Sequence, residues 1–392
     1  MNTNIPAWAL YIHWPFCASK CPYCDFNSHV LSSIPFERFK NALLKELETL
    51  TKRISPKPSL QSIFFGGGTP SLMQPETVAV LIEQAKSYFL TDAQLEITLE
   101  ANPSSFDQKK FRSFKHAGVN RLSLGVQSFD DTTLKLLGRK HNAQEAESAI
   151  QACADLFPSF SFDLMYGIPN QTIESWQQQL NKALAFKPKH LSCYQLTFEK
   201  GTAFYTRFQR GELQYPNEDQ AIIFDNVTEK TLEDKNLHRY EVSNYADFGH
   251  ESRHNLAYWQ AYPTLGIGPG SHGRPLLNGK TYAEENLRAP LTWLESVEKT
   301  GSGVKKLQTL SSYDRLKEWL LMGLRLKNGV PLTDAERVTG KTAQAWLKEN
   351  HFQKKVHDLF KADLLNINLE KGHLYATKKG RLKLNGILEY LF

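Results

Sequence analysis

Three cysteines stand close together near the start of the chain, at Cys17, Cys21 and Cys24. Thiolates are the ligands that iron–sulfur clusters prefer, and a [4Fe–4S] cube contains four irons. Three protein ligands leave one iron open, and an open iron can chelate the amino and carboxylate groups of a methionine moiety. The spacing therefore predicts a [4Fe–4S] cluster that binds S-adenosylmethionine at its fourth iron.

Zinc is the alternative metal for such a loop. Zinc sites usually close with four ligands in paired spacings, and no second cysteine pair lies near this one. Cys153 and Cys193 fall in helix-like and strand-like runs, so we interpret them as buried core residues. Five cysteines in 392 residues do not form a disulfide scaffold, which predicts a cytoplasmic location.

The bulk composition is that of an ordinary globular protein, with 41% hydrophobic residues and a formal charge of +6. We find no secretory signal and no run of eighteen apolar residues that would span a membrane. The weak positive charge is compatible with an anionic partner but does not require one.

Strand-like and helix-like runs alternate through the first half of the chain, which predicts a parallel sheet covered by helices. Six such units are too few for a complete eight-stranded barrel, so we expect an α/β fold with a partial, TIM-like barrel. The expected strands are Trp8–His13, Ser62–Phe65, Leu95–Glu100, Asn120–Val126, Phe160–Tyr166 and His190–Thr197, and the expected helices are Pro35–Leu50, Pro75–Phe89, Phe106–His116, Asp130–Leu137, Ala143–Leu156 and Ile173–Phe186.

The pattern changes after the sixth unit, and we divide the chain into a barrel over 1–205, a connecting region over 206–305 and a C-terminal domain over 306–392. The last domain combines helices with a hairpin at Leu364–Leu369 and Leu374–Thr377 and a final helix at Gly380–Leu391, which is typical of a winged-helix-like α+β module. It has no basic recognition face, so we expect it to serve packing and not nucleic acid binding.

Further motifs follow the cysteine loop in order along the first 275 residues. They are Gly66–Pro70, Glu100–Pro103, Arg121–Phe129, Leu137–Arg139, Asp163–Pro169, His254–Trp259 and Gly266–Gly273. With Tyr11–Phe26, these segments resemble the radical S-adenosylmethionine superfamily. More narrowly, they resemble the anaerobic coproporphyrinogen dehydrogenase family and its haem-chaperone branch of the HemW type.

The resemblance implies a set of cofactor-binding residues at successive strand ends. Glycines allow close backbone approach to a ligand, carboxylates and amides can bond ribose or methionyl groups, and an arginine suits a carboxylate. Arg139 lies far from the cysteines in sequence, so we expect it to leave cluster assembly unaffected. The expected set is Tyr11, Tyr23, Gly67, Gly68, Thr69, Glu100, Gln127, Arg139, Asp163 and Thr197.

Two departures separate the chain from the dehydrogenase pattern and match the chaperone branch. Asp25 and Phe26 follow Cys24, where the dehydrogenase carries a fourth cysteine two residues after the third. Only sixteen residues precede Cys17, too few for the dehydrogenase's N-terminal arm. The branch implies a haem chaperone that receives haem from a donor and delivers it to respiratory proteins, with coproporphyrinogen III decarboxylation as the alternative. It leaves open whether radical chemistry occurs. It also leaves open whether the protein forms a homodimer and whether it makes a peripheral contact with a membrane.

His254 opens the segment that the branch associates with haem. A neutral imidazole can ligate haem iron, and Tyr258 and Trp259 offer flat faces to a porphyrin. A histidine in such a loop more often makes a structural hydrogen bond, and His29, His250 and His272 are further candidates for the ligand.

Overall fold

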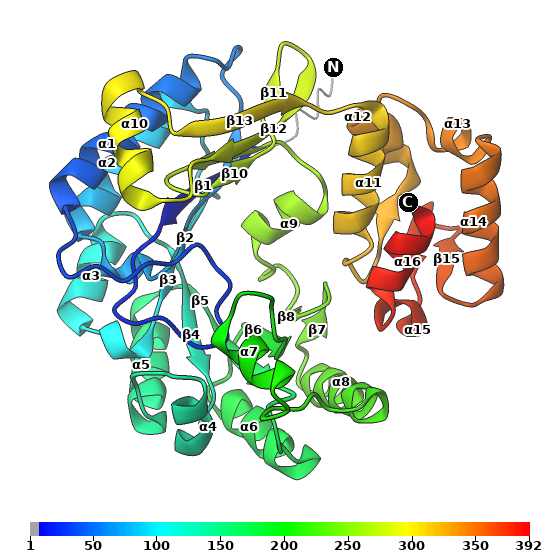
Figure 1. The fold of residues 1–392 in the computed structure, drawn as a ribbon, viewed down its shortest axis with the longest axis horizontal. Helices are drawn as coiled ribbons and strands as arrows, with labels where there is room; N and C mark the ends of the chain where they lie inside the picture. The colour runs from blue at the N-terminus through cyan, green and yellow to red at the C-terminus, as the bar shows by residue number, and fades with distance from the viewer. Residues whose placement is uncertain (1–7) are drawn as a thin grey trace.

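The computed structural model describes residues 8–392 of the chain, and its first half is the expected series of strand–helix units. The strands are β1 (Trp8–Trp14), β2 (Leu60–Gly67), β3 (Glu96–Ala101), β4 (Arg121–Gln127), β5 (Ser159–Tyr166) and β6 (His190–Gln195). The helices are α1 (Phe36–Thr51), α2 (Pro75–Tyr88), α3 (Gln108–His116), α4 (Asp131–Leu136), α5 (Ala143–Leu156) and α6 (Ile173–Ala185). The prediction of a partial α/β barrel is confirmed (Figure 1).

Three strands from the connecting region extend this sheet beyond the six units. The order is β7-β8-β6-β5-β4-β3-β2-β1-β9, with β7 (His238–Arg239), β8 (Asn244–Ala246) and β9 (Thr264–Ile267). β9 runs parallel to β1, so that Tyr11 pairs with Phe64 on one side and Gly266 on the other. The sheet is therefore continuous across the boundary that we placed at residue 205.

The helices begin where the sequence supplies caps. Asp107 accepts hydrogen bonds from two backbone amides of α3, and Asn142 forms a reciprocal capping box with Glu145 at the start of α5. These side chains satisfy amides that have no partner inside the helix, and each cap contributes about 1 kcal/mol. A 3-10 turn at Pro103–Ser105 precedes α3, which therefore begins two residues later than we expected.

The main core lies between the sheet and its outer helices. Trp14 and Phe16 are fully buried and pack edge-on against Phe39 of α1, with ring centroids 5.9 and 4.9 Å away. β1 is buried along both faces, as expected for a strand with neighbours on each side. This packing holds the start of the cysteine loop against a rigid base.

A buried ion pair lies inside the barrel, where β3 and β4 begin. Glu96 pairs with Arg121 at 3.8 Å, and its carboxylate accepts from the backbone amides of Arg253 and His254 at 3.1 Å each. Both amides lie in the first turn of α9 (Arg253–Trp259), where a carboxylate is favoured by the helix dipole. α9 therefore closes the end of the barrel opposite the carboxyl ends of the strands.

The rest of the connecting region packs around the barrel rim. It contains α7 (Ala203–Gln209), α8 (Glu218–Glu233), β10 (His272–Gly273), β11 (Leu276–Leu277), β12 (Lys280–Asn286), α10 (Pro290–Thr300) and β13 (Val304–Thr309). The buried Glu46 of α1 joins this region to the barrel, because it accepts from Gly268, Asn286, Trp293 and Gly303.

The C-terminal helices form a separate lobe with a core of its own, at the right of Figure 1. Its helices are α11 (Ser312–Gly323), α12 (Ala335–Thr339), α13 (Ala343–Leu347), α14 (Asn350–Lys361), α15 (Lys378–Arg381) and α16 (Leu384–Leu391). The hairpin β15 (Leu365–Asn368) and β16 (His373–Ala376) is where we predicted it, and β14 (Val330–Pro331) adds a third strand that we missed. The predicted final helix is divided into α15 and α16.

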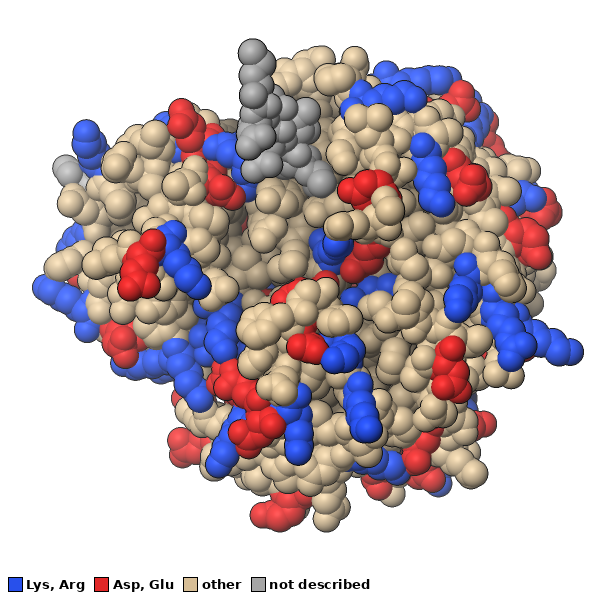
Figure 2. All heavy atoms as spheres, turned by 180° about the vertical axis from the view of Figure 1, so that it is seen from behind, with Lys and Arg blue, Asp and Glu red and all other residues tan. Residues whose placement is uncertain are grey.

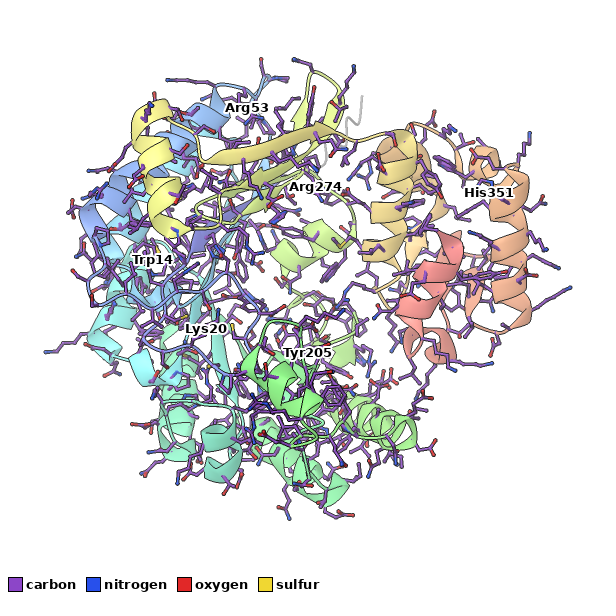
Figure 3. All side chains as sticks on the ribbon, viewed as in Figure 1. Trp14, Lys20, Arg53, Tyr205, Arg274 and His351 are labelled. Carbon is purple, nitrogen blue, oxygen red and sulfur yellow. The ribbon has the colours of Figure 1, made fainter. Side chains whose placement is uncertain are left out.

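Arginines on both sides join the C-terminal lobe to the rest of the molecule. Arg274 of the connecting region, labelled in Figure 3, forms an ion pair with Glu318 of α11 at 2.8 Å. Arg325 lies 4.7 Å from the ring centroid of Trp259, and Arg337 donates to the carbonyl of Gln260 at the end of α9. Cations favour a helix C-terminus, so the lobe is docked directly over α9.

Charges are interspersed over the face seen in Figure 2, without a field of one sign. Within residues 8–392, no helix is both long and apolar enough to cross a membrane.

Candidate cofactor site

A cavity of about 510 Å³ opens at the carboxyl ends of the strands, the side on which barrel enzymes bind ligands. Its volume suits one ligand of cofactor size. Twelve of the predicted cofactor and metal residues line it, contributed by the cysteine loop, the ends of β2 to β5 and the segments after α4 and β6. They are Cys17, Cys21, Tyr23, Cys24, Gly67, Gly68, Thr69, Glu100, Gln127, Arg139, Asp163 and Thr197.

The cysteine loop is held by backbone hydrogen bonds at its base. The amide of Cys17 donates to the carbonyl of His29 at 2.9 Å, and the amide of His29 donates to Pro15 at 2.7 Å. α7 borders the other side of the loop, because the amide of Phe204 donates to Pro22. Figure 3 labels Lys20 on this loop and Tyr205 on α7. Both ends of the loop are therefore fixed while its middle faces the cavity.

The three thiols fit a cluster better than a single ion. None forms a disulfide, and all three face one cavity. Within the described chain, no three His, Cys, Asp or Glu side chains are grouped so that they could hold one metal ion. Thiolates of a four-iron cube each bind a different iron and need not converge on one point. Burial raises the pKa of Cys17, and the hydroxyl of Thr69, 3.4 Å from its sulfur, opposes that rise.

The glycine turn after β2 brings backbone to the cavity wall with no room for side chains. Gly67 has φ +117°, and a Cβ there would lie 2.5 Å from a carbon of the His13 ring. A Cβ on Gly68 would lie 2.6 Å from the carbonyl oxygen of Phe16. Glycine is therefore required at both positions. Without a side chain, the backbone of the turn can come close to a ligand.

Asn102 is a polar centre of the site that we did not predict, although it lies in the Glu100–Pro103 motif. Its Nδ2 donates to Thr69 Oγ1 at 3.0 Å, and its Oδ1 accepts a short hydrogen bond from Arg139 Nη2. Arg139 also donates to the carbonyl of Gly125 at 2.6 Å. These bonds connect the glycine turn, β3 and the segment after α4. The signal that could have identified Asn102 is its place directly after a strand end.

Arg139 lies beside the cysteine loop, and this contact argues against our expectation that cluster assembly does not depend on Arg139. Its Nη1 donates to the sulfur of Cys21 at 3.6 Å, and Tyr23 lies close enough to influence its pKa. Arg139 and Cys21 are far apart in sequence but close in space, because the cysteine loop folds across the strand ends and meets the segment after α4. A Cβ on Gly138 would lie 2.6 Å from Pro22, so the contact is close along its length.

Two carboxyl groups share the deep end of the cavity. Burial and, to a lesser extent, the nearby charge of Asp163 raise the pKa of Glu100 to about 8. Glu100 accepts from the amide of Gly67 at 3.1 Å, which ties it to the glycine turn. Burial raises the pKa of Asp163 to about 6, against a hydrogen bond from Ser192 and the charge of Arg139. Such protonated or hydrogen-bonded carboxyls suit ribose hydroxyls or an amino group.

Three further predicted residues, Gln127, Tyr23 and Thr197, also line the cavity. Gln127 ends β4 with φ +72°, an unusual conformation that aims it at the cavity. Burial raises the pKa of Tyr23. Thr197 lines the cavity but lies after β6, which ends at Gln195 and not at Thr197.

Tyr11 does not line the cavity. Its ring stacks on Phe64 with centroids 6.1 Å apart, and its hydroxyl lies 2.9 Å from His13 Nδ1. The side chain points into the barrel beneath Gly66, because a strand sends alternate side chains to opposite faces. Tyr11 therefore supports the glycine turn from behind.

The predicted haem segment forms α9 inside the barrel. The His254 ring stacks on Phe64 at 4.7 Å, and its Nδ1 lies 2.9 Å from Ser62 Oγ. The side chain is 3% exposed, and burial lowers its pKa to about 3. Tyr258 packs 5.1 Å from His254, while Trp259 lies beneath Arg325. In this conformation no face of the imidazole is open to a ligand as large as haem.

The family models that match the chain are Radical SAM superfamily over residues 11–183 and HemN C-terminal domain over residues 310–382. The second model covers the C-terminal lobe from α11 to α15.

Among curated proteins, the chain is 35% identical to heme chaperone HemW of Haemophilus influenzae, over 98% of both chains. It is 32% identical to heme chaperone HemW of Bacillus subtilis, over 95% of this chain and 96% of that one. It is also 43% identical to the mitochondrial radical S-adenosyl methionine domain-containing protein 1 of Mus musculus, over 82% of this chain and 74% of that one.

Among solved structures, coproporphyrinogen III oxidase of Escherichia coli has the same fold, with a TM-score of 0.80 over 98% of this chain and 90% of that one. The two are 21% identical, so this likeness concerns the fold alone.

Proposed function

This chain belongs to the HemW family of the radical S-adenosylmethionine superfamily, and we propose that it is a haem chaperone that binds haem and delivers it to haem-dependent proteins. The observation that carries the proposal is the similarity to named heme chaperones along nearly the whole chain, including the C-terminal lobe. Phe26, at the position where the dehydrogenase pattern places a fourth cysteine, supports the same conclusion.

We further propose that the cavity holds a [4Fe–4S] cluster and S-adenosylmethionine. Cys17, Cys21 and Cys24 would hold the cluster, and the turn at Gly67 and Gly68 would receive the methionyl group. When bound, the pair can supply a one-electron cleavage of a sulfur–carbon bond. Arg139 is held in place by its hydrogen bonds to Asn102 and Gly125, and it forms part of the cavity wall opposite the glycine turn. With its pKa raised to about 8, the buried Glu100 keeps its proton at neutral pH and can donate a hydrogen bond to a polar group of the ligand, while Asp163 can accept one.

Coproporphyrinogen decarboxylation is the weaker alternative. Phe26 occupies the position at which the dehydrogenase pattern places a fourth cysteine, and its side chain is 62% exposed. The cavity is of a size for one cofactor, and a tetrapyrrole would need a second space of similar volume. The likeness to the oxidase structure is one of fold and adds nothing to this alternative.

The partners follow from the proposed role. A chaperone needs a haem donor and a haem acceptor, and we propose respiratory haem proteins as acceptors. A homodimer and a peripheral membrane contact stay predictions. The cytoplasmic location also stays a prediction, because the animal relatives are named as mitochondrial proteins.

A transfer assay tests the proposal. The reconstituted protein is loaded with haem, mixed with an apo-haem protein and separated by size, and the Soret absorbance of each fraction is measured. Movement of haem to the acceptor supports the chaperone. Protoporphyrinogen formed at catalytic turnover under anaerobic, reducing conditions would instead establish the dehydrogenase.

A further inference from the structure

A segment with exposed apolar side chains follows the third cysteine, on the outside of the cysteine loop. Phe26, Val30 and Leu31 are 62%, 51% and 36% exposed within six residues of one another. Single exposed apolar residues are common on proteins, but a group of them marks a site of interaction. Phe26 also lines the mouth of the cofactor cavity, so the group adjoins that site.

His29 lies within this segment and is anchored to the first cluster ligand. Its carbonyl accepts from the amide of Cys17 at 2.9 Å, and its own amide donates to Pro15. The imidazole is half-buried. The backbone thus fixes the residue, while the ring is held only by side-chain contacts.

Asn27 determines which nitrogen of His29 carries the hydrogen. Its Nδ2 donates to the carbonyls of Pro269 and Arg288, both at 2.9 Å, and this fixes the orientation of the amide. Its Oδ1 must then accept, and it lies 3.1 Å from His29 Nε2. His29 Nε2 therefore carries the hydrogen, and Nδ1 keeps its lone pair. Imidazoles that bind metals usually donate their other N–H to an oxygen in this way.

Two exposed cations accompany the ring. Lys20 and Arg288 are both exposed, and they lie close enough to His29 to lower its pKa together with the effect of partial burial. Neither forms an ion pair with a carboxylate in residues 8–392, and Lys20 Nζ contacts only the carbonyl of Ser28 at 3.4 Å. They are available to an anionic ligand.

We propose that haem docks on this cluster-loop surface, with His29 as the imidazole that meets the iron and with cations for its propionates. The surface comprises Lys20, Phe26, His29, Val30, Leu31 and Arg288. The inference rests on the proposed chaperone function and names the haem site within it. Exposed apolar side chains, a free imidazole lone pair and cations without a carboxylate partner are what haem requires together, whereas the His254 ring is buried.

The test is a haem titration of the full chain with its cluster reconstituted, followed by Soret absorbance and iron content. His29→Ala should weaken haem binding about tenfold or more and shift the Soret band, with four irons retained because the backbone bond to Cys17 survives. His272→Ala is the matched control, an exposed imidazole also near Arg288, and should change neither quantity. The double variant Lys20→Ala, Arg288→Ala should bind haem more weakly than wild type. It should bind haem dimethyl ester as wild type does, because the esterified propionates carry no charge that the two cations could meet.

Each other outcome has one meaning. If wild type binds no haem, the chaperone function itself fails. If wild type binds haem and His29→Ala matches it, the function stands and this site is overturned. If His254→Ala changes the Soret band of bound haem and His29→Ala does not, His254 of α9 is the haem ligand and the proposal is overturned. If Phe26→Ser and Leu31→Ser abolish binding to anionic vesicles while haem affinity stays the same, the surface is a membrane contact and the proposal is overturned.

Discussion

Arg139 donates a hydrogen bond to the sulfur of Cys21, although 118 residues separate them in the chain. The same guanidinium bonds Asn102 and Gly125, so one side chain joins the cysteine loop to two strand ends. A change at Arg139 should therefore disturb both the cluster ligand Cys21 and the cavity wall formed by Asn102 and Gly125.

Replacing Arg139 with Ala should lower affinity for S-adenosylmethionine and also loosen the cluster. We expect a loss of about 1.5–3 kcal/mol in binding, the range for a hydrogen bond to a charged group. Calorimetry measures the affinity, and iron content after gel filtration measures cluster retention. Arg112→Ala, an exposed arginine of α3, is the control. Unchanged affinity would mean that Arg139 faces no ligand.

Replacing Cys17, Cys21 or Cys24 with Ala should abolish the brown colour of the anaerobically reconstituted protein. No spare thiol is near, since Cys153 and Cys193 are buried in the barrel core. Cys153→Ala should therefore keep its iron and its visible absorbance band. A Cys17→Ala protein with four irons would refute the cluster assignment.

Gly67→Ala should prevent cofactor binding and destabilise the fold. The added Cβ would meet the His13 ring, and alanine at positive φ is strained, so we expect a loss of about 1–3 kcal/mol in unfolding free energy. Chemical denaturation and a cofactor titration measure the two effects. Gly386→Ala in α16 makes a matched comparison, since its Cβ would meet open space and should stabilise the helix by about 0.5–1 kcal/mol. Equal effects from both changes would exclude a special role for the turn.

Glu100→Gln should stabilise the cofactor-free protein increasingly as the pH rises. The folded pKa of Glu100 is about 8, above the ordinary value of 4.5, so the folded state holds a proton that the unfolded chain has lost. This costs stability as pH rises from 4.5 to 8, by at most about 1.4 kcal/mol per pH unit. Melting temperatures of wild type and variant should coincide at pH 4.5 and separate toward pH 8. Glu370→Gln, at an exposed site, should show no such separation.

His254→Ala should lower the melting temperature at neutral pH. The change removes a ring stacked on Phe64 and leaves Ser62 without its partner, at a cost of about 2–4 kcal/mol. Burial lowers the pKa of His254 to about 3, so its neutral form stabilises the fold above pH 6.5, and this contribution is lost as the pH falls toward 3. The variant should therefore lose less stability than wild type between pH 6.5 and 4. A wild-type melting temperature in the variant would show that the ring is not part of the core.

The barrel could be predicted because its signals are local. Each strand–helix unit has an apolar run, a turn and a periodic helix, and α5 was predicted to the residue. Likewise, Gly67 and Glu100 lie where strands end, which is where a parallel sheet gathers its ligand residues. Short strands such as β14, with two residues, carry no such signal.

The contacts of His254 could not be predicted, because they depend on where α9 lies and not on its sequence. A helix after β8 could have packed outside the sheet with its imidazole exposed. Glu96, far away in the chain, instead holds the first turn of α9 inside the barrel. The same reason explains Arg139 and Cys21, whose contact is created by the path of a loop.

The pairing of β1 with β9 has a consequence for synthesis on the ribosome. β1 is made before the other strands of its sheet, yet its outer neighbour ends at Ile267, about 250 residues later. At about 5–20 residues per second, the open edge of a largely apolar strand waits on the order of 10–50 s before it is covered. A nascent chain of this protein thus exposes an unpaired strand edge until β9 is made, and a truncated product that stops before Thr264 would keep that edge permanently.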